Sequence, residues 1–337
     1  MMTNNFLSFR LTRFLVFAGT LLSISQAHAQ WQKISNHVDF FQQSANLRFY
    51  DSNQILIKGD NCALMFDASG NFSAVEATVK HLKHTLKVPL CYLVASHFHD
   101  DHLLGMAVLQ HHYPNAKLIT HQKLAANFAD FKQAYNNKLE TYQQSIELSF
   151  QRLAKQPKEK QPAWRDKLEL AKNRLLRWQE YTLKPPALAV TDSLALDLGN
   201  YPITINAYQA HTNADLMLYA EQQTILIGGD IVDYLPYPGH GNLTDWRELL
   251  TELAANTIEQ TILPGHGEPI TIKDLQHSHA FLTAIQEHVQ NNPEQDLTQL
   301  QQSFNEQFAN QYITDEISAK AYPIFLQAGL KRAKQSK

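Results

Sequence analysis

The chain of 337 residues contains little cysteine, no Gly/Ser-rich linker, no internal repeat and no low-complexity segment. Beyond its first thirty residues it lacks any apolar stretch of about 20 residues, the length that a membrane-spanning helix needs. Hydrophobic residues make up 44% of the chain and charged residues 18%, which excludes an intrinsically disordered protein. A globular chain of this length can bury the core of one large domain or of two modest ones.

Cys62 and Cys91 are the two cysteines, and neither has the spacing of a metal ligand. Both lie in apolar, strand-like runs, at residues 61–66 and 90–95. An oxidising compartment would permit a disulfide, but a sequence cannot test the separation of the two Cα atoms that a bridge requires. Two buried free thiols are the favoured interpretation, and a bridge stays open as the alternative.

Residues 1–29 have the pattern of a secretory signal peptide. Two arginines precede an apolar run at residues 14–24, and an Ala-His-Ala cleavage site follows. The run is too short to cross a bilayer. We therefore expect cleavage before Gln30 and export, most simply to the periplasm; an uncleaved N-terminal anchor is the alternative.

Charge excludes one class of partner. Removal of the first 29 residues deletes two arginines and no acidic residue, which changes the formal net charge from −3 to −5. A mildly acidic chain carries no electrostatic footprint for nucleic acid. The basic residues at the C-terminus are expected to form a frayed, solvated tail; they are Lys331, Arg332, Lys334 and Lys337.

Strand-like and helix-like segments alternate along most of the chain, which indicates a layered α/β fold. Continuous apolar runs such as 90–95 predict strands that are buried on both faces. The expected strands are residues 38–41, 54–58, 62–66, 90–95, 117–120, 203–208, 216–219, 224–227 and 261–263. The expected helices of this part are residues 73–87, 103–112, 272–290 and 297–311.

Residues 122–186 interrupt this alternation. From Leu124 to Leu153 the apolar residues recur with a mean step close to 3.6, which predicts one long amphipathic helix. A charged turn with two prolines follows, and the same period resumes from Trp164 to Trp178. The pair predicts an inserted helical hairpin whose stripe packs against another surface. The hairpin could shape the substrate entrance or join two copies of the chain in a homo-oligomer.

Histidine and aspartate gather at the ends of the expected strands. His97, His99, Asp101 and His102 directly follow the buried strand 90–95. His211, Asp230 and His266 each follow another strand, and the last two are flanked by glycines that permit tight loops. Imidazole and carboxylate ligands suit zinc or another divalent first-row metal. Loops at strand ends are where α/β folds place their sites.

This order of motifs resembles the metallo-β-lactamase superfamily: His-x-His-x-Asp-His with Gly105, then His-Thr, Gly-Asp and Gly-His-Gly. The resemblance covers roughly residues 38–269. It implies a four-layer αββα fold, here with an inserted helical hairpin (about 122–186) and a helical C-terminal extension (about 271–337), in one hydrolase domain spanning residues 30–337.

The resemblance also implies roles for these residues. His97, His99 and His211 would hold a first zinc ion; Asp101, His102 and His266 would hold a second; Asp230 would bridge the two. Asp101 and Asp230 would take part in catalysis, in which a metal-bound hydroxide attacks an ester, thioester, lactone or amide bond of a small-molecule substrate.

Five neighbouring residues are ambiguous. Asp100 is interpreted as a solvated carboxylate or one that supports a ligand. Asp67 resembles an aspartate that orients a ligand in this family, although a turn residue explains it equally well. Thr212 could bond a ligand or a neighbouring loop, and His240 and Asn242 lie in a loop that faces substrate or is ordinary.

Family resemblance leaves four functions open, because this fold hosts many substrates. A general exported hydrolase comes first. A β-lactamase is second, but that branch usually has cysteine where this chain has Asp230, and aspartate there resembles the glyoxalase II and lactonase branches. A flavodiiron-type redox protein is third, but such proteins carry an acidic residue where this chain has His99, and no flavin domain follows here. A non-catalytic metal-binding module is disfavoured by the complete ligand set.

Overall fold

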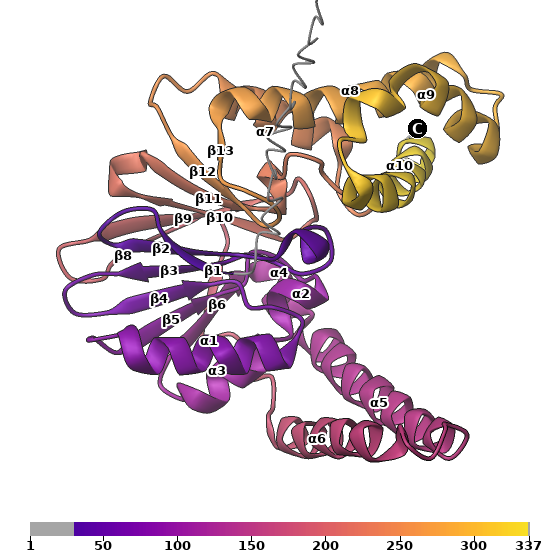
Figure 1. Cartoon of the computed structure of the whole chain (residues 1–337). Helices are drawn as coiled ribbons and strands as arrows, with labels where there is room; N and C mark the ends of the chain where they lie inside the picture. The colour runs from indigo at the N-terminus through magenta and orange to yellow at the C-terminus, as the bar shows by residue number, and fades with distance from the viewer. Residues whose placement is uncertain (1–29, 336–337) are drawn as a thin grey trace, which may run out of the picture.

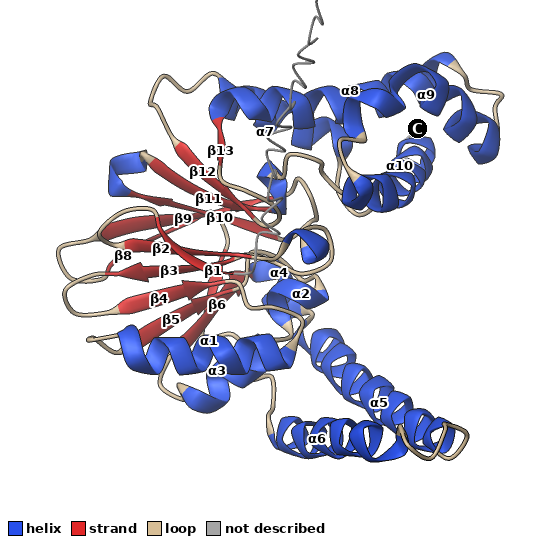
Figure 2. Cartoon of the chain, viewed as in Figure 1, coloured by secondary structure: helices blue, strands red, loops and turns tan. Residues whose placement is uncertain are grey.

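The computed structural model describes residues 30–335. The predicted signal peptide, residues 1–29, lies outside the described residues. Two β-sheets are stacked face to face, and helices cover the outer face of each (Figure 1). This is the four-layer αββα arrangement that the sequence predicts. Figure 2 shows the strands gathered in the two middle layers, with the hairpin and the C-terminal helices outside them.

The first sheet has seven strands in chain order, and its second half, from β4 to β7, is parallel. The strands are β1 (Gln30–Lys33), β2 (Val38–Gln42), β3 (Gln54–Lys58), β4 (Ala63–Phe66), β5 (Leu90–Val94), β6 (Lys117–His121) and β7 (Leu188–Val190). Each parallel connection needs a crossover, and the helices between these strands supply it.

The second sheet has six strands in the order β13-β12-β11-β10-β9-β8, in which only β11 and β12 are parallel neighbours. They are β8 (Ser193–Asp197), β9 (Pro202–Tyr208), β10 (Asp215–Ala220), β11 (Ile225–Gly229), β12 (Thr261–Pro264) and β13 (Ile270–Thr271). The short strands β1, β7, β8 and β13 were not predicted from the sequence.

Continuous apolar strands are buried on both faces, as predicted. In β4, Leu64 and Phe66 pack between the two sheets, whereas Ala63 and Met65 face the helices. Strand β11 does the same on the other side, since Ile225 and Ile227 point inward and Leu226 points to the outer helices. A strand with two buried faces shows no polar alternation, which explains these sequences.

The helices cover the outer faces in two groups. One group lies on the first sheet: α1 (Phe72–Thr85), α2 (Asp100–Leu103) and α3 (Met106–His112). Helices α7 (Leu243–Ala254) and α8 (Leu275–Asn291) lie over the second sheet, and α9 (Leu297–Tyr312) and α10 (Glu316–Gln335) pack against α8. Short 3-10 turns complete the described residues: η1 (Ala45–Leu47), η2 (Glu221–Gln223), η3 (Asp230–Val232) and η4 (Ile272–Asp274). Helix α7 was not predicted.

The hairpin is present, but its first helix is shorter than predicted. Residues 122–153 form α4 (Gln122–Ala126) and α5 (Phe128–Leu153), which are separated at Asn127, so Leu124 does not belong to the long helix. Helix α6 (Gln161–Glu180) returns beside α5. Tyr135 and Trp178 are buried, and both rings contact Phe72 of α1, which confirms the packing stripe near the body.

The predicted frayed basic tail is wrong for the residues that the structure describes. Residues 316–335 form α10, in which Leu326 and Leu330 are buried in the core beneath the second sheet's helices. Arg332 and Lys334 donate hydrogen bonds to the carbonyl oxygens of Gly241 and Gln295, at 2.6 Å each. The basic residues therefore help to pack this helix against the domain.

The expectation of two buried free thiols is also wrong, because Cys62 and Cys91 form a disulfide with Cα atoms 5.7 Å apart. Cys62 directly precedes β4 and Cys91 is the second residue of β5, and in these parallel neighbours Ala63 lies opposite Leu90. Both cysteines are partly exposed. The strand pairing brings them together, which local sequence could not reveal.

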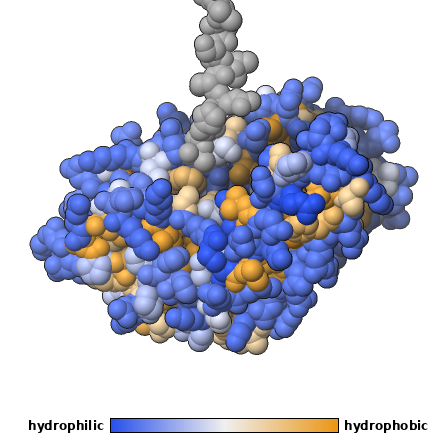
Figure 3. All heavy atoms as spheres, turned by 60° about the horizontal axis from the view of Figure 1, so that its bottom comes forward, coloured by the Kyte–Doolittle hydropathy of each residue, from blue (hydrophilic) through white to orange (hydrophobic). Residues whose placement is uncertain are grey.

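The surface is mostly hydrophilic on the face shown in Figure 3, with separate small hydrophobic patches. Scattered apolar residues are normal on the surface of a folded protein. Among residues 30–335, no helix is both long and apolar enough to cross a membrane.

Candidate metal centre

The seven residues predicted as metal ligands come together at one end of the two sheets. His97 and His99 follow β5, and Asp101 and His102 lie in the adjoining short helix α2. The other three follow strands of the second sheet: His211 after β9, Asp230 directly after β11 and His266 after β12. The centre is therefore assembled from both sheets.

Three imidazoles and one carboxylate form the first group, in which the ligand atoms lie within 4.8 Å of one another. Nε2 of His211 lies 3.2 Å from Nδ1 of His99. Oδ2 of Asp230 lies 3.4 Å from Nε2 of His211 and 3.6 Å from Nε2 of His97. His97 and His211 are almost completely buried.

Asp101, His102 and His266 form the second group. Oδ2 of Asp101 lies 3.5 Å from Nε2 of His102 and 3.4 Å from Nε2 of His266. The two imidazole Nε2 atoms lie 3.4 Å apart. Asp230 also reaches this group, with Oδ1 3.1 Å from Nε2 of His102 and Oδ2 3.5 Å from Nε2 of His266. Asp230 is therefore the residue that both groups share.

The spacing of these atoms fits bound cations. Two ligand atoms that are each about 2.0–2.1 Å from a tetrahedral ion lie about 3.3 Å apart. The distances above cluster around this value. Nε2 of His97 and Oδ1 of Asp230 are buried without a hydrogen-bond partner in the described structure, and buried polar atoms are otherwise almost always satisfied. A cation between the two groups would satisfy both.

Protonation of the first group favours the same role. Burial lowers the pKa of His97 and His211 well below the usual value and that of His99 to about 4. These imidazoles are neutral at physiological pH, which is the state that binds metal. Burial acts in the same direction on His102 and His266, but the nearby carboxylates, Asp230 above all, raise the pKa of both.

Asp230 carries negative charge in this setting. Burial alone would raise its pKa, but the imidazoles of His102, His266 and His97 outweigh burial and hold the pKa well below its usual value. A buried carboxylate among five imidazoles is strongly attracted to positive charge. Gly265 makes room for it, because a Cβ atom there would lie 2.0 Å from Oδ1 of Asp230.

The carboxylate of Asp67 contacts His102, one of the predicted ligands, on the side of the ring away from the candidate metal centre. Its Oδ2 lies 2.8 Å from Nδ1 of His102, and its Oδ1 accepts a hydrogen bond from the backbone N–H of Ser96 at 2.7 Å. The residue has a left-handed backbone with φ of 61°, which aspartate tolerates better than most residues. Of the two interpretations of Asp67, the structure supports the one in which it orients a ligand.

Two further carboxylates, which fix the loops of His211 and His266, were not predicted from the sequence. Asp215 accepts hydrogen bonds from the backbone N–H groups of Ala210 and Thr212 and from the Thr212 hydroxyl, which fixes the His211 loop. Asp233 accepts from the backbone N–H of His266 at 2.9 Å. The spacing of Thr212 and Asp215 could have indicated such a turn. Nothing near Asp233 in the sequence points to the loop of His266.

The structure gives each of the remaining ambiguous residues a distinct position. Asp100 is exposed and lies 3.5 Å from Nζ of Lys138, so it is a solvated carboxylate. Asn242 caps α7 by accepting hydrogen bonds from Thr244 and Asp245, so it has a structural role. His240 is exposed and lies beside the first group, with the centroid of its imidazole ring 4.9 Å from that of His99.

The αββα sandwich and the two clusters of possible metal ligands together support one class of protein. That class is the divalent-metal-dependent hydrolases. The model of the metallo-β-lactamase superfamily matches residues 47–266, which is most of the chain. The chain therefore belongs to the metallo-β-lactamase superfamily.

Two curated relatives are named acyl-coenzyme A thioesterase MBLAC2, from Bos taurus and Homo sapiens. Each is 29% identical over 87 residues, which covers 24% of this chain and 31% of the relative. The match thus spans about a third of those proteins. A solved metallo-β-lactamase from Pontibacter korlensis is 18% identical, with a TM-score of 0.53, covering 76% of this chain and 99% of that one. This likeness shows the fold.

Proposed function

We propose that this protein is an exported dinuclear zinc hydrolase that cleaves an acyl bond, with thioesters and esters as the first substrate class. The observation that carries the proposal is the shared position of Asp230, whose two oxygens lie within 3.6 Å of imidazoles from both ligand groups. A carboxylate placed between two ligand sets favours two ions held close together. When bound, two zinc ions supply an activated water and polarise the carbonyl of the substrate.

The protein's own residues would divide the work. His97, His99 and His211 would hold one ion, Asp101, His102 and His266 the other, and Asp230 both. Asp67 would keep the imidazole of His102 turned so that Nε2 faces the centre. His240 stands beside the first group, where its imidazole could contact the substrate.

Two observations support the thioester and ester class. The carboxylate of Asp230 occupies the bridging position where the β-lactamase branch that this motif resembles usually has cysteine. The curated relatives with a matching segment are named as thioesterases. Lactones and amides remain in the same reaction class, because each is opened by attack of water on a carbonyl carbon.

Export rests on separate observations. The first 29 residues have the arginines, apolar run and cleavage site of a signal peptide. The disulfide between Cys62 and Cys91 supports the same conclusion, because such bonds persist mainly in oxidising compartments.

The test is a substrate panel measured together with metal content. Purified mature protein is mixed with thioesters, carboxylic esters, lactones and β-lactams, and bound metal is determined by elemental analysis. We expect thioesters or esters to be hydrolysed fastest and activity to disappear with a chelator. Faster hydrolysis of β-lactams would instead assign the protein to the β-lactamases. Protein that holds its metal but hydrolyses nothing would favour the non-catalytic alternative.

A further inference from the structure

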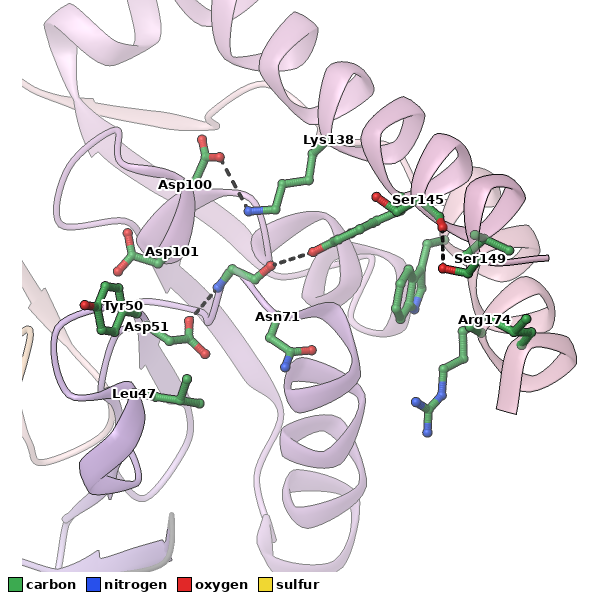
Figure 4. Close-up of a pocket in the computed structure, with 16 residues that line it drawn as sticks. Leu47, Tyr50, Asp51, Asn71, Asp100, Asp101, Lys138, Ser145, Ser149 and Arg174 are labelled. Carbon is green, nitrogen blue, oxygen red and sulfur yellow. Dashed lines mark hydrogen bonds and ion pairs between the residues drawn. The ribbon is translucent and has the colours of Figure 1, made fainter. Parts of the chain in front are cut away.

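A groove lies beside the candidate metal centre, between the inserted hairpin and the rest of the domain. It has a volume of about 630 Å³ and begins at Asp101, one of the expected ligands. One wall comes from α5 and α6, and the other from the segments around Tyr50 and Gly70. Binding sites for small molecules have volumes of about 300–1,000 Å³, so the groove can hold a substrate of moderate size. Figure 4 shows both walls and the carboxylates at its inner end.

The hairpin wall is largely apolar. Residues 168, 171, 174 and 178 line it at helical spacing, so they share one face of α6. From α5, Tyr142 and Ile146 add apolar side chains to this surface, and Lys138, Ser145 and Ser149 add polar ones. An apolar wall of this kind binds a hydrocarbon chain by removing it from water.

Hydrogen bonds hold this wall in place against the body. The indole N–H of Trp178 donates to Oε1 of Glu76 in α1 at 3.1 Å. The hydroxyl of Tyr135 donates to the carbonyl oxygen of Trp178 at 3.0 Å. Phe131, at the start of α5, stacks on Phe98 between the two metal-ligand histidines, with ring centroids 5.7 Å apart. The start of the hairpin is thus packed against the loop that carries His97 and His99.

Arg174 supplies a positive charge to this apolar wall. Its side chain lines the groove, and in the described structure no carboxylate forms an ion pair with it. One turn further along the same helix, Arg177 is already paired with Glu76 at 3.1 Å. An arginine without a carboxylate partner beside an apolar surface is a suitable site for an anionic group of a ligand.

The acidic residues of the groove do not cancel this charge. The carboxylate of Asp51 is buried and accepts hydrogen bonds from Ser69, the backbone N–H of Gly70, and Gln43. Asp100 is paired with Lys138, which lines the same groove. Asp101 faces the candidate metal ions. Arg174 is therefore left to meet an anion that arrives with the ligand.

A second hollow beside the centre fits such a ligand less well. It has a volume of about 320 Å³ and is lined by His266, Asp233, Glu268 and Arg48. Both terminal oxygens of Asp315 already accept hydrogen bonds from the guanidinium of Arg48, at 2.9 Å. This hollow is smaller and acidic, and its arginine is engaged.

We propose that the hairpin groove determines substrate choice and takes an ester or thioester with an apolar chain that ends in an anionic group. The carbonyl lies next to Asp101, the chain lies against Tyr142, Ile146 and Trp178, and the anion pairs with Arg174. This inference rests on the proposed acyl-bond hydrolysis for the chemistry at the inner end. The groove and its unpaired arginine are independent of that proposal.

The test measures binding without turnover. Ketones in which CH2 replaces the sulfur of a thioester cannot be hydrolysed, so isothermal titration calorimetry reports their affinity for the metal-loaded protein. Two medium-chain ketones are compared, one ending in a carboxylate and one in a methyl group. We expect the carboxylate to improve affinity about tenfold or more, the effect of one charged hydrogen-bonded pair.

Matched variants assign the effect to the groove. Arg174→Gln should abolish the preference for the carboxylate, whereas Arg165→Gln, which changes an exposed residue of the same helix outside the groove, should retain it. Ile146→Asn should weaken both ketones at least about fivefold, from loss of apolar contact. Leu148→Asn changes an exposed residue of α5, the helix that also holds Ile146, and should weaken the binding of neither ketone.

The outcomes separate the two proposals. Equal affinity of the two ketones for the unaltered protein, or equal loss in Arg174→Gln and Arg165→Gln, would overturn the groove assignment. If the ketones bind as expected but the matching thioesters and esters are not hydrolysed, the proposed function is wrong and the groove assignment stands. Thermal unfolding and metal content of every variant identify any loss of affinity that comes from misfolding.

Discussion

Oδ2 of Asp67 lies 2.8 Å from Nδ1 of His102, on the opposite side of the ring from Nε2, which faces Asp230 at 3.1 Å. The imidazole is thus held between two carboxylates at a fixed orientation. A histidine that donates its Nδ1 proton in this way presents the lone pair of Nε2 to a metal.

This relationship predicts the effect of Asp67→Asn. The amide keeps the size and can still accept from His102, but it removes the negative charge that strengthens the imidazole as a ligand. We expect the affinity for one of the two metal ions to fall about 10–100-fold, measured by competition with a chelator. Asp166→Asn, an exposed change on the hairpin, is the control. Unchanged affinity in Asp67→Asn would show that Asp67 is only a turn residue.

Metal content tests the two-ion proposal. Because two ligand groups share Asp230, protein purified without chelator and supplied with zinc should hold about two equivalents per chain. Chelation should also lower the melting temperature, since it leaves the buried ligand atoms without a partner. Elemental analysis that gives less than one equivalent after zinc is added would exclude the dinuclear site.

Asp230→Asn tests the bridge. The substitution keeps the size but removes the charge that two ions would share, so the ion at His102 and His266 should be weakened or lost first. We expect kcat to fall at least about a hundredfold. His97→Ala should be more damaging, since it weakens the three-histidine group. Two retained ions and near-normal turnover in Asp230→Asn would refute the assignment.

The disulfide should contribute measurably to stability. Replacing Cys62 and Cys91 together by serine removes a bridge between residues 29 positions apart, which should lower the free energy of unfolding by about 3.6 kcal/mol. Denaturant unfolding measures the change. A reductant should destabilise the unaltered protein and leave the double variant unaffected; equal stability of the two proteins without reductant would argue against the bond in solution.

Export makes a prediction about the N-terminus. Protein recovered from the periplasm of a host that expresses the full chain should begin at Gln30, which can cyclise. Intact-mass spectrometry gives the answer directly. Exported protein that retains residues 1–29 would instead support the uncleaved anchor.

The meeting of the candidate ligands at one end of the sheets could be predicted, because they follow strands that local sequence reveals. His97 follows a continuous apolar run, and Asp230 and His266 follow others, so the fold's layers imply that they meet. The supporting contact of Asp233 could not be predicted, because it depends on where the distant His266 loop lies. The disulfide was missed for the same reason, since it depends on the pairing of β4 with β5.

Helix α10 lies within the predicted helical C-terminal extension, but it was not predicted as a separate helix, for a different reason. Pro323 lies inside it, and proline usually ends a helix. The helix persists because tertiary packing outweighs this local preference: Tyr322 and Leu326, on either side of the proline, are buried in the core. The break at Asn127 was hidden because apolar spacing continues across it, from Leu124 to Phe128.

The hairpin joins β6 and β7, which are parallel neighbours in the sheet with Ile119 opposite Leu188. All seven predicted ligands lie outside this connection, so evolution could exchange it without rebuilding the proposed metal centre. A homologue with a different insertion would retain the proposed reaction and bind a different set of substrates. For the same reason, swapping hairpins between relatives offers an engineering route to new substrates.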